Sequence, residues 1–155
     1  MSKVDEHLAA EGITLPDAPA PAANYVPFVR TGNLIVISGQ LPFFEGKVKF
    51  QGRLGDTVAV EEGVQSARLC AINLLANLKV ACGGDLSKVE RVVRLGGFVA
   101  ATPELEQHPA VINGASDLMA SIFGDAGAHA RAAVGVASLP LGASVEVEGM
   151  FEVSK

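Results

Sequence analysis

The segment from about Val60 to Ala81 limits the fold of this chain more than any other part of the sequence. Its apolar and small side chains recur at the 3.6-residue period of an amphipathic helix, at Val60, Val64, Ala67, Ala71, Leu74, Leu75, Leu78 and Ala81. The segment is followed by Gly83-Gly84, where a left-handed helix cap costs little. A helix with one apolar face must bury it against another layer, so the sequence predicts a layered fold.

Strand-like segments flank this helix on both sides. The expected order is strands over 25–29 and 34–38, a weaker strand over 43–50, the helix over 60–81, a strand over 89–99, a second amphipathic helix over 110–123, and strands over 130–137 and 144–153. This ββ(β)αβαββ order predicts an α+β fold, with a mixed sheet and two helices on one of its faces. The other face is left for a ligand or a partner subunit.

The N-terminal region differs from the rest of the chain. Val4–Glu11 predicts a short helix, and Leu15–Ala23 contains three prolines, which favour an extended, polyproline-like tether. We expect residues 1–24 to form an N-terminal extension and residues 25–155 to form a single domain. The first residues carry acids and contain no apolar stretch, so they resemble neither a secretory signal nor a transit peptide. We therefore expect a cytoplasmic location.

Composition excludes several classes of protein. Apolar residues make up 49% of the chain and charged residues 19%, which rules out disorder. The longest uncharged runs, Thr31–Phe44 and Ala132–Val145, have 14 residues each, fewer than the roughly 18 needed to span a bilayer. A net charge of −5, one Tyr and no Trp argue against a nucleic-acid partner. So much apolar surface in a small domain predicts a homo-oligomer.

The titratable and nucleophilic residues show no metal or cofactor motif. Cys70 and Cys82 lack further ligands at metal-binding spacing, and the three histidines are far apart, so no metal site is expected. The sequence also lacks a phosphate-binding glycine loop and a Ser/His/Asp or Cys/His arrangement. We therefore expect neither covalent nor nucleotide-dependent chemistry, and we expect packing roles for both cysteines.

The strand over 130–137 is predicted to present different side chains on its two faces. We expect the valine side, with Val134, to lie under the helices, and Arg131 to stand among small residues on the open side. A hairpin turn at 139–142 would pair this strand with the last one. Glu146 would then share the open side with Arg131, about 13 Å away along the strand.

Arg131 and Glu146 are the leading candidates for chemistry. The Arg131 guanidinium among Ala and Gly offers a planar fork to a carboxylate, or it forms a structural ion pair with Glu146 or Glu148. The Glu146 carboxylate is suited to hold or activate a water, although a polar residue at an exposed edge is the more common case. The residue pattern leaves both pairs of alternatives open.

Four other residues are candidates for binding a ligand. Tyr25 either closes over a ligand with its hydroxyl or packs at the start of its strand. Ser38 and Gly39 end a strand, where the backbone of the glycine can approach a ligand closely. Asn113 is either a helix-surface residue or a hydrogen-bonding lid.

Three short segments in order resemble one known family: Ile37–Pro42 (ISGQLP), Ala130–Val134 (ARAAV), and Val145–Glu148 (VEVE) after Leu139-Pro140. They are similar to the RidA proteins, also called YjgF or L-PSP proteins, over about Tyr25 to Val153. The resemblance implies a chorismate-mutase-like fold. It also implies a homotrimer with a barrel-like centre and clefts between subunits.

The same resemblance implies an activity. Active family members hydrolyse 2-aminoacrylate-type enamines, or their imine tautomers such as 2-iminopropanoate and 2-iminobutanoate, to 2-keto acids and ammonia without a cofactor. By motif position, Arg131 matches the residue that grips the substrate carboxylate and Glu146 the acid associated with the attacking water. Tyr25, Ser38, Gly39, Asn113 and Ala133 fall at positions that line the pocket.

The chain also departs from the family pattern. Ala133 stands where many relatives have Cys, and His129 where many have Pro. The extension through about Ala23 indicates a separate branch of the family. Two other functions therefore stay open: a trimer that binds keto acids without turnover, and the endoribonuclease or translation-inhibitor activity of the family's older names, which the acidic charge disfavours.

Overall fold

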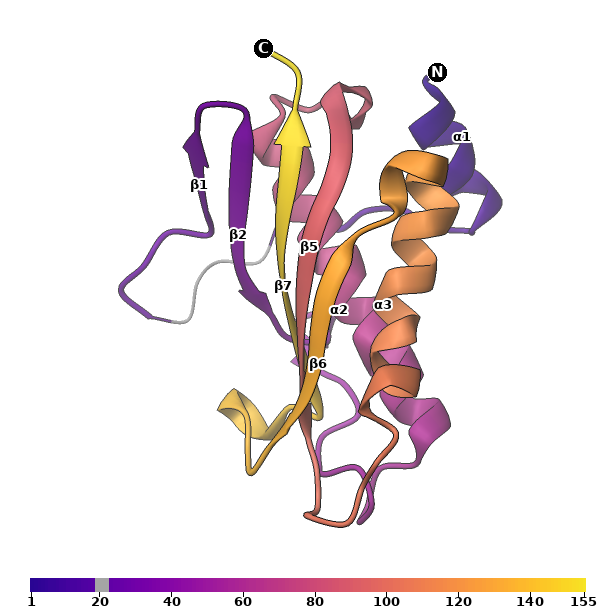
Figure 1. Cartoon of the computed structure of the whole chain (residues 1–155), viewed down its shortest axis with the longest axis vertical. Helices are drawn as coiled ribbons and strands as arrows, with labels where there is room; N and C mark the ends of the chain where they lie inside the picture. The colour runs from indigo at the N-terminus through magenta and orange to yellow at the C-terminus, as the bar shows by residue number, and fades with distance from the viewer. Residues whose placement is uncertain (19–22) are drawn as a thin grey trace.

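The computed structural model describes residues 1–18 and 23–155. Its elements, shown in Figure 1, are α1 (Lys3–Ala10), β1 (Phe28–Thr31), β2 (Leu34–Gln40), β3 (Phe43–Phe44), β4 (Lys47–Val48), α2 (Val60–Ala81), β5 (Val89–Ala100), α3 (His108–Phe123), β6 (Ala130–Val136) and β7 (Val145–Val153), with short 3-10 turns at Leu86–Lys88, Gly124–Gly127 and Pro140–Gly142. The weak strand expected over 43–50 is instead the tight β3–β4 hairpin, because the chain turns at Glu45-Gly46. The expected tether falls partly on residues 19–22, which lie outside the described residues.

A five-stranded mixed sheet forms one layer of the fold. Its order is β1-β2-β7-β5-β6, in which only the β5–β6 pair is parallel. Both long helices pack on the same face of this sheet, as expected, and the other face is open (Figure 1). The core between the layers contains side chains that are at most 2% exposed, among them Ile35, Ile37, Leu95, Val99, Val147 and Phe151 from strands and Leu74, Leu78, Ile112, Leu118 and Ile122 from helices.

The two long helices approach each other closely at Gly114 of α3. A Cβ on this glycine would collide with the backbone carbonyl of Val64 in α2. Residues larger than glycine therefore do not fit between the helices at this point. The contact explains why a glycine is found in the middle of a helix, where it is otherwise unfavourable.

The expected hairpin between β6 and β7 is wrong, because β5 lies between these two strands. Leu95 of β5 is in register with Arg131 on one side and with Gly149 on the other. The chain runs from β5 through α3 to β6, and such a helical crossover joins parallel neighbours. The segment with the Pro140–Gly142 turn then carries the chain past β5 to the far side, where β7 pairs with β5 and β2.

The expected orientation of β6 is also wrong. Arg131 and Ala133 face the helix layer, whereas Val134 is 46% exposed on the open face. Only small side chains fit beneath the start of α3: a Cβ on Gly135 would lie 2.6 Å from Nε2 of His108. Alanine and glycine on this side of β6 therefore reflect a close helix contact, not an empty surface.

The N-terminal helix lies against the helix layer. Ser2 caps α1 through a reciprocal capping box with Asp5, whose pKa is lowered by the hydrogen bonds from Ser2. His7 Nδ1 lies 2.8 Å from the carbonyl oxygen of Ile122 at the end of α3, and Leu8 is buried. In the described part of the chain, no helix is both long enough and apolar enough to cross a bilayer.

Candidate functional site

Arg131 is held at the boundary between β6 and α3. Its Nη1 donates to Oγ of Ser116 over 3.1 Å, and its Nη2 donates to the carbonyl oxygen of Pro109 over 3.1 Å. A guanidinium has five N–H groups, and these two contacts use two of them. The remaining donors are available to an anion, and the two contacts to α3 fix the plane of the group.

A second hydrogen-bonded pair supports this arrangement. Nδ1 of His129 lies 2.6 Å from the carbonyl oxygen of Gly127, and Nε2 lies 2.8 Å from Oγ of Ser116. A carbonyl only accepts, so Nδ1 donates to Gly127, and in this tautomer Nε2 accepts the Ser116 hydroxyl proton. The Ser116 oxygen then accepts from Arg131. Arg131, Ser116 and His129 thus form one directed chain of hydrogen bonds.

Two predicted binding residues belong to the Arg131 group. Asn113 is exposed on α3, four residues after Pro109 and three before Ser116, so it lies on the same side of the helix. Ala133 follows Arg131 on the same face of β6 and is partly buried. Sequence reasoning missed Ser116, because only the tertiary structure places it beside Arg131.

Glu146 belongs to a separate group on the other face of the sheet. Its carboxyl group lies over Gly39 of the neighbouring strand: a Cβ on Gly39 would be 2.9 Å from Cδ of Glu146. Ser38 and Gly39 occupy an irregularity in the β2–β7 register, between Ile37 and Gln40. Partial burial, and in second place the negative charge of Glu148, raise the pKa of Glu146.

The segment that carries Tyr25 is attached to the Glu146 group by hydrogen bonds from Ser38. Ser38 donates its hydroxyl proton to the carbonyl oxygen of Val26 over 2.8 Å, and its backbone N–H donates to Pro27. These bonds tie the segment that carries Tyr25 to the end of β2. The Tyr25 side chain itself is 47% exposed.

The structure does not bring Arg131 and Glu146 together within one chain. Arg131 is in register with Leu95 and Glu146 with Phe98, three residues further along β5, and positions three apart on a strand point to opposite faces. The expectation that both share the open face is therefore wrong. Nor does Arg131 form the alternative ion pair with Glu148, whose carboxylate lies 3.3 Å from Arg94 instead.

In the described part of the chain, the other titratable side chains form neither a metal-binding group nor an exposed thiol. Within residues 1–18 and 23–155, no three His, Cys, Asp or Glu side chains are grouped so that they could hold a metal ion. Cys70 and Cys82 are buried free thiols, and burial raises the pKa of both. Neither is suited to act as a thiolate nucleophile.

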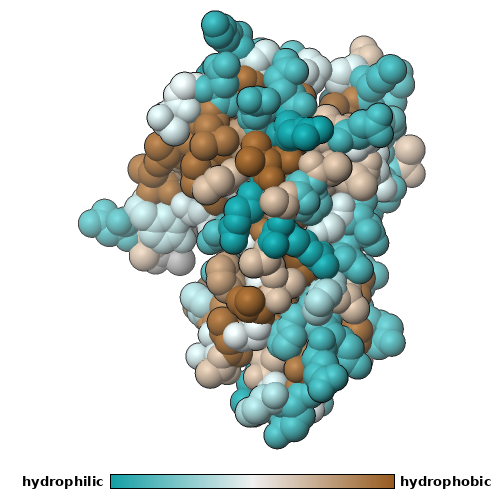
Figure 2. Space-filling model, in the orientation of Figure 1, coloured by the Kyte–Doolittle hydropathy of each residue, from teal (hydrophilic) through white to brown (hydrophobic). Residues whose placement is uncertain are grey.

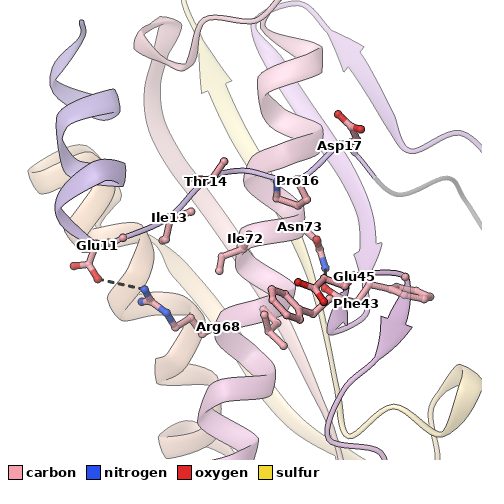
Figure 3. Close-up of a pocket in the computed structure, with 14 residues that line it drawn as sticks. Glu11, Ile13, Thr14, Pro16, Asp17, Phe43, Glu45, Arg68, Ile72 and Asn73 are labelled. Carbon is pink, nitrogen blue, oxygen red and sulfur yellow. Dashed lines mark hydrogen bonds and ion pairs between the residues drawn. The ribbon is translucent and has the colours of Figure 1, made fainter.

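Two cavities differ in position, and only the smaller one lies beside these groups. A hollow of about 190 Å³ on the open face is lined by Ser38, Arg94 and Glu148, close to the Glu146 group. A larger cavity, of about 570 Å³, lies elsewhere, between residues 11–17, α2 and the β3–β4 hairpin (Figure 3). No predicted site residue lines the larger cavity.

The fold of this chain is found in known proteins. A family model described as "YjgF/chorismate_mutase-like, putative endoribonuclease" matches residues 5–152. The chain belongs to this YjgF family. The family match confirms the resemblance to the RidA proteins and their chorismate-mutase-like fold.

Three YjgF-family relatives illustrate the similarity. Protein TCP17 of Trypanosoma cruzi is 45% identical over 98% of this chain and 95% of its own. The crystal structure of Atu1372 from Agrobacterium tumefaciens, a protein of unknown function, is 49% identical, with a TM-score of 0.93 over 98% of this chain and 93% of that one. A 2-iminobutanoate/2-iminopropanoate deaminase of Dermatophagoides farinae is 30% identical over 91% of this chain and 94% of its own.

Proposed function

We propose that this protein hydrolyses 2-imino acids and their enamine tautomers, of the 2-aminoacrylate, 2-iminopropanoate and 2-iminobutanoate type, to 2-keto acids and ammonia without a cofactor. The observation that carries the proposal is the Arg131 guanidinium, oriented by Ser116 and the Pro109 carbonyl with further N–H groups available. A bidentate contact to a planar carboxylate is the strongest use of such a group. The Dermatophagoides relative supports the choice of substrate.

The chemistry needs little beyond binding and one oriented water. The oxygen of water adds to the imine carbon, and the nitrogen takes up a proton. The C–N bond of the resulting carbinolamine then breaks, so ammonia leaves and the C=O of the keto acid forms. Glu146 is assigned to this water. Because its pKa is raised, the carboxyl group can accept and return a proton at a higher pH than an ordinary glutamate.

The proposed site requires a second copy of the chain, since Arg131 and Glu146 point to opposite faces of the sheet. We assign one group to each side of a cleft between subunits of a homotrimer. Exposed apolar residues on the open face support this assembly, among them Val29 (53% exposed) and Val134 (46% exposed). Figure 2 shows apolar side chains gathered on this face over β1 and β2.

The test is the release of ammonia and keto acid from freshly generated 2-iminopropanoate and 2-iminobutanoate, compared with uncatalysed hydrolysis. The wild type should accelerate both, and Arg131→Ala should lose the acceleration while keeping its oligomeric state. Arg53→Ala is the matched control, because Arg53 forms an exposed ion pair with Asp56. Wild-type rates equal to the uncatalysed rates, or full activity in Arg131→Ala, would contradict the proposal.

Two other functions are tested by further measurements on the same proteins. Binding of 2-ketobutyrate without ammonia release from either imine would replace the deaminase by a metabolite-binding role. RNA cleavage that co-purifies with the protein and is lost in Arg131→Ala would favour the endoribonuclease named in the family description. The net charge of −5 argues against that second outcome.

A further inference from the structure

We propose that the cavity between residues 11–17 and α2 is a second ligand site, for a small molecule with an apolar body and an amine or other N–H donor group. The volume of about 570 Å³ falls in the range of small-molecule sites. Residues 11–17, part of the proposed extension 1–24, form one wall. The outward side of α2 forms the floor, and the β3–β4 hairpin forms the opposite wall (Figure 3).

The interior of this cavity suits an apolar body. Ile13 from the N-terminal segment, Leu69 and Ile72 from α2, and Phe43 and Phe44 from the hairpin contribute to its lining. Figure 3 shows Ile72 and Phe43 pointing into the space below the N-terminal segment. Phe44 is 50% exposed, which leaves apolar surface for a ligand to cover.

One buried amide supplies a polar anchor. Asn73 is 2% exposed, and its Nδ2 donates to the carbonyl oxygens of Leu41 (3.0 Å) and Phe43 (3.1 Å). Both amide protons are thereby used, so Oδ1 is the atom of this amide that is left to accept a hydrogen bond. In Figure 3 this oxygen turns toward Pro16, away from Phe43. An N–H group of the ligand would complete the hydrogen bonding of Asn73.

The charges at the rim select against anions. Arg68 pairs with Glu11 over 3.4 Å, so its charge is already balanced. Asp17 and Glu45 also line the cavity and take part in no ion pair among the described residues. With three carboxylates and one guanidinium, the rim carries a net negative charge. This disfavours the carboxylate substrates proposed for Arg131 and favours a neutral or cationic molecule.

The position of the cavity keeps it separate from the proposed reaction. Arg68 and Ile72 lie on the side of α2 away from the sheet, and the open face of the sheet lies on the other side of the molecule (Figures 1 and 3). Subunits that meet through their open faces would leave this cavity accessible. The inference therefore stands whether or not the chain is a deaminase.

Two fluorescent probes of nearly the same shape test the site. N-phenyl-1-naphthylamine is neutral, apolar and carries one N–H, whereas 8-anilino-1-naphthalenesulfonate adds a sulfonate to the same skeleton. We expect saturable binding of the neutral probe, one molecule per chain, and at least about tenfold weaker binding of the sulfonate. Octylamine should displace the neutral probe, and octanoate should not. Absence of saturable binding would overturn the proposal, and equal affinity for both probes would overturn its charge selectivity.

Substitutions in α2 locate the binding. Ile72→Trp should fill the cavity and weaken binding of the neutral probe by about tenfold or more. Val80→Trp is the matched control, since Val80 is 57% exposed on the same helix and outside the cavity. Circular dichroism checks that both variants are folded. Equal binding by Ile72→Trp and the wild type would place the probe elsewhere and refute the site.

The rim is tested by charge reversal. Glu45→Lys should bring the affinities for the two probes closer together, whereas Glu104→Lys, at an exposed loop position outside the cavity, should leave their ratio unchanged. The same shift in both variants would show that net charge, not this rim, selects the ligand. Failure of these binding tests leaves the imine assay unaffected, so the two proposals fail separately.

Discussion

Arg131 and Glu146 lie on opposite faces of the same sheet, with β5 between their strands. Their positions are about 10 Å apart across the sheet and about 10 Å apart along it. Neither side chain can reach the other around the sheet edge while Arg131 is bonded to α3. Any reaction that uses both residues must therefore use two copies of the chain.

Mixing two inactive variants tests this consequence. Arg131→Ala and Glu146→Gln should each be inactive, but subunits exchanged between them should recover activity. In a random equal mixture, about a quarter of the clefts in a trimer would contain both native groups. Imine hydrolysis before and after co-refolding measures the recovery. A mixture as inactive as its components would show that the two residues do not share a cleft.

Removal of the Ser116 hydroxyl should disturb the orientation of Arg131. Hydrogen bonds to charged groups contribute about 1.5–3 kcal/mol, so Ser116→Ala should lower kcat/KM about tenfold or more, mainly through KM. Ser116→Thr keeps the hydroxyl and should retain most of the activity. Ser87→Ala, which removes a hydroxyl bonded to Asp85, is the control. An equal loss in the Ala and Thr variants would argue against a role of the hydroxyl.

A methyl group at Gly39 should displace the Glu146 carboxyl. The new Cβ would lie 2.9–3.1 Å from three side-chain atoms of Glu146, which must move aside. The end of a flexible side chain can shift, so Gly39→Ala should lower stability by only about 1 kcal/mol. The rate of imine hydrolysis by Gly39→Ala should fall by much more than this small loss of stability can explain. Thermal melting and imine hydrolysis, measured on the same preparation, separate the two effects, and unchanged turnover would refute the role of Glu146.

Glu146 should make stability fall as the pH rises. Its pKa in the folded state lies above the ordinary value, so the folded state binds more protons than the unfolded chain in the window above about pH 4.5. The native carboxyl therefore destabilises the fold once it ionises. Glu146→Gln should melt at a higher temperature than the wild type at pH 7, and the difference should vanish near pH 4. If the two proteins differ in melting temperature by the same amount at pH 4 and at pH 7, the raised pKa of Glu146 is contradicted.

The contact between α2 and α3 leaves no room at Gly114. Gly114→Ala would place a methyl group against the Val64 carbonyl, and neither backbone can move easily. We expect a loss of about 3 kcal/mol in the free energy of unfolding, or failure to fold. Asn113→Ala, one residue away on the exposed side of α3, should change stability by less than about 0.5 kcal/mol. Denaturant unfolding of the two variants gives the comparison.

Local sequence patterns were sufficient for most elements of this fold. The apolar period predicted α2 over 60–81, where the structure also places it, and the predicted bounds of β5, α3 and β7 are within two residues of those observed. These patterns work because each helix or strand needs one apolar face in contact with the core. The family, too, is evident from short segments such as ISGQLP.

The candidate site was predictable only as a set of residues. Arg131, Asn113 and Ala133 do lie together, as do Glu146, Gly39 and Ser38, but the sequence analysis placed Arg131 and Glu146 on one face of one hairpin. Ser116 was missed, because no spacing along the chain relates it to Arg131. Alanine and glycine next to Arg131 were interpreted as room for a ligand, whereas the start of α3 occupies that space.

The sequence by itself therefore determined which segments are helices and strands, their order, and the family to which the chain belongs. Only the tertiary structure decided which strands are neighbours and which way Arg131 faces. The reason is physical: period and turn chemistry act between residues near each other in the chain. The position of β5 between β6 and β7 depends instead on the crossover through α3 and on packing between distant segments.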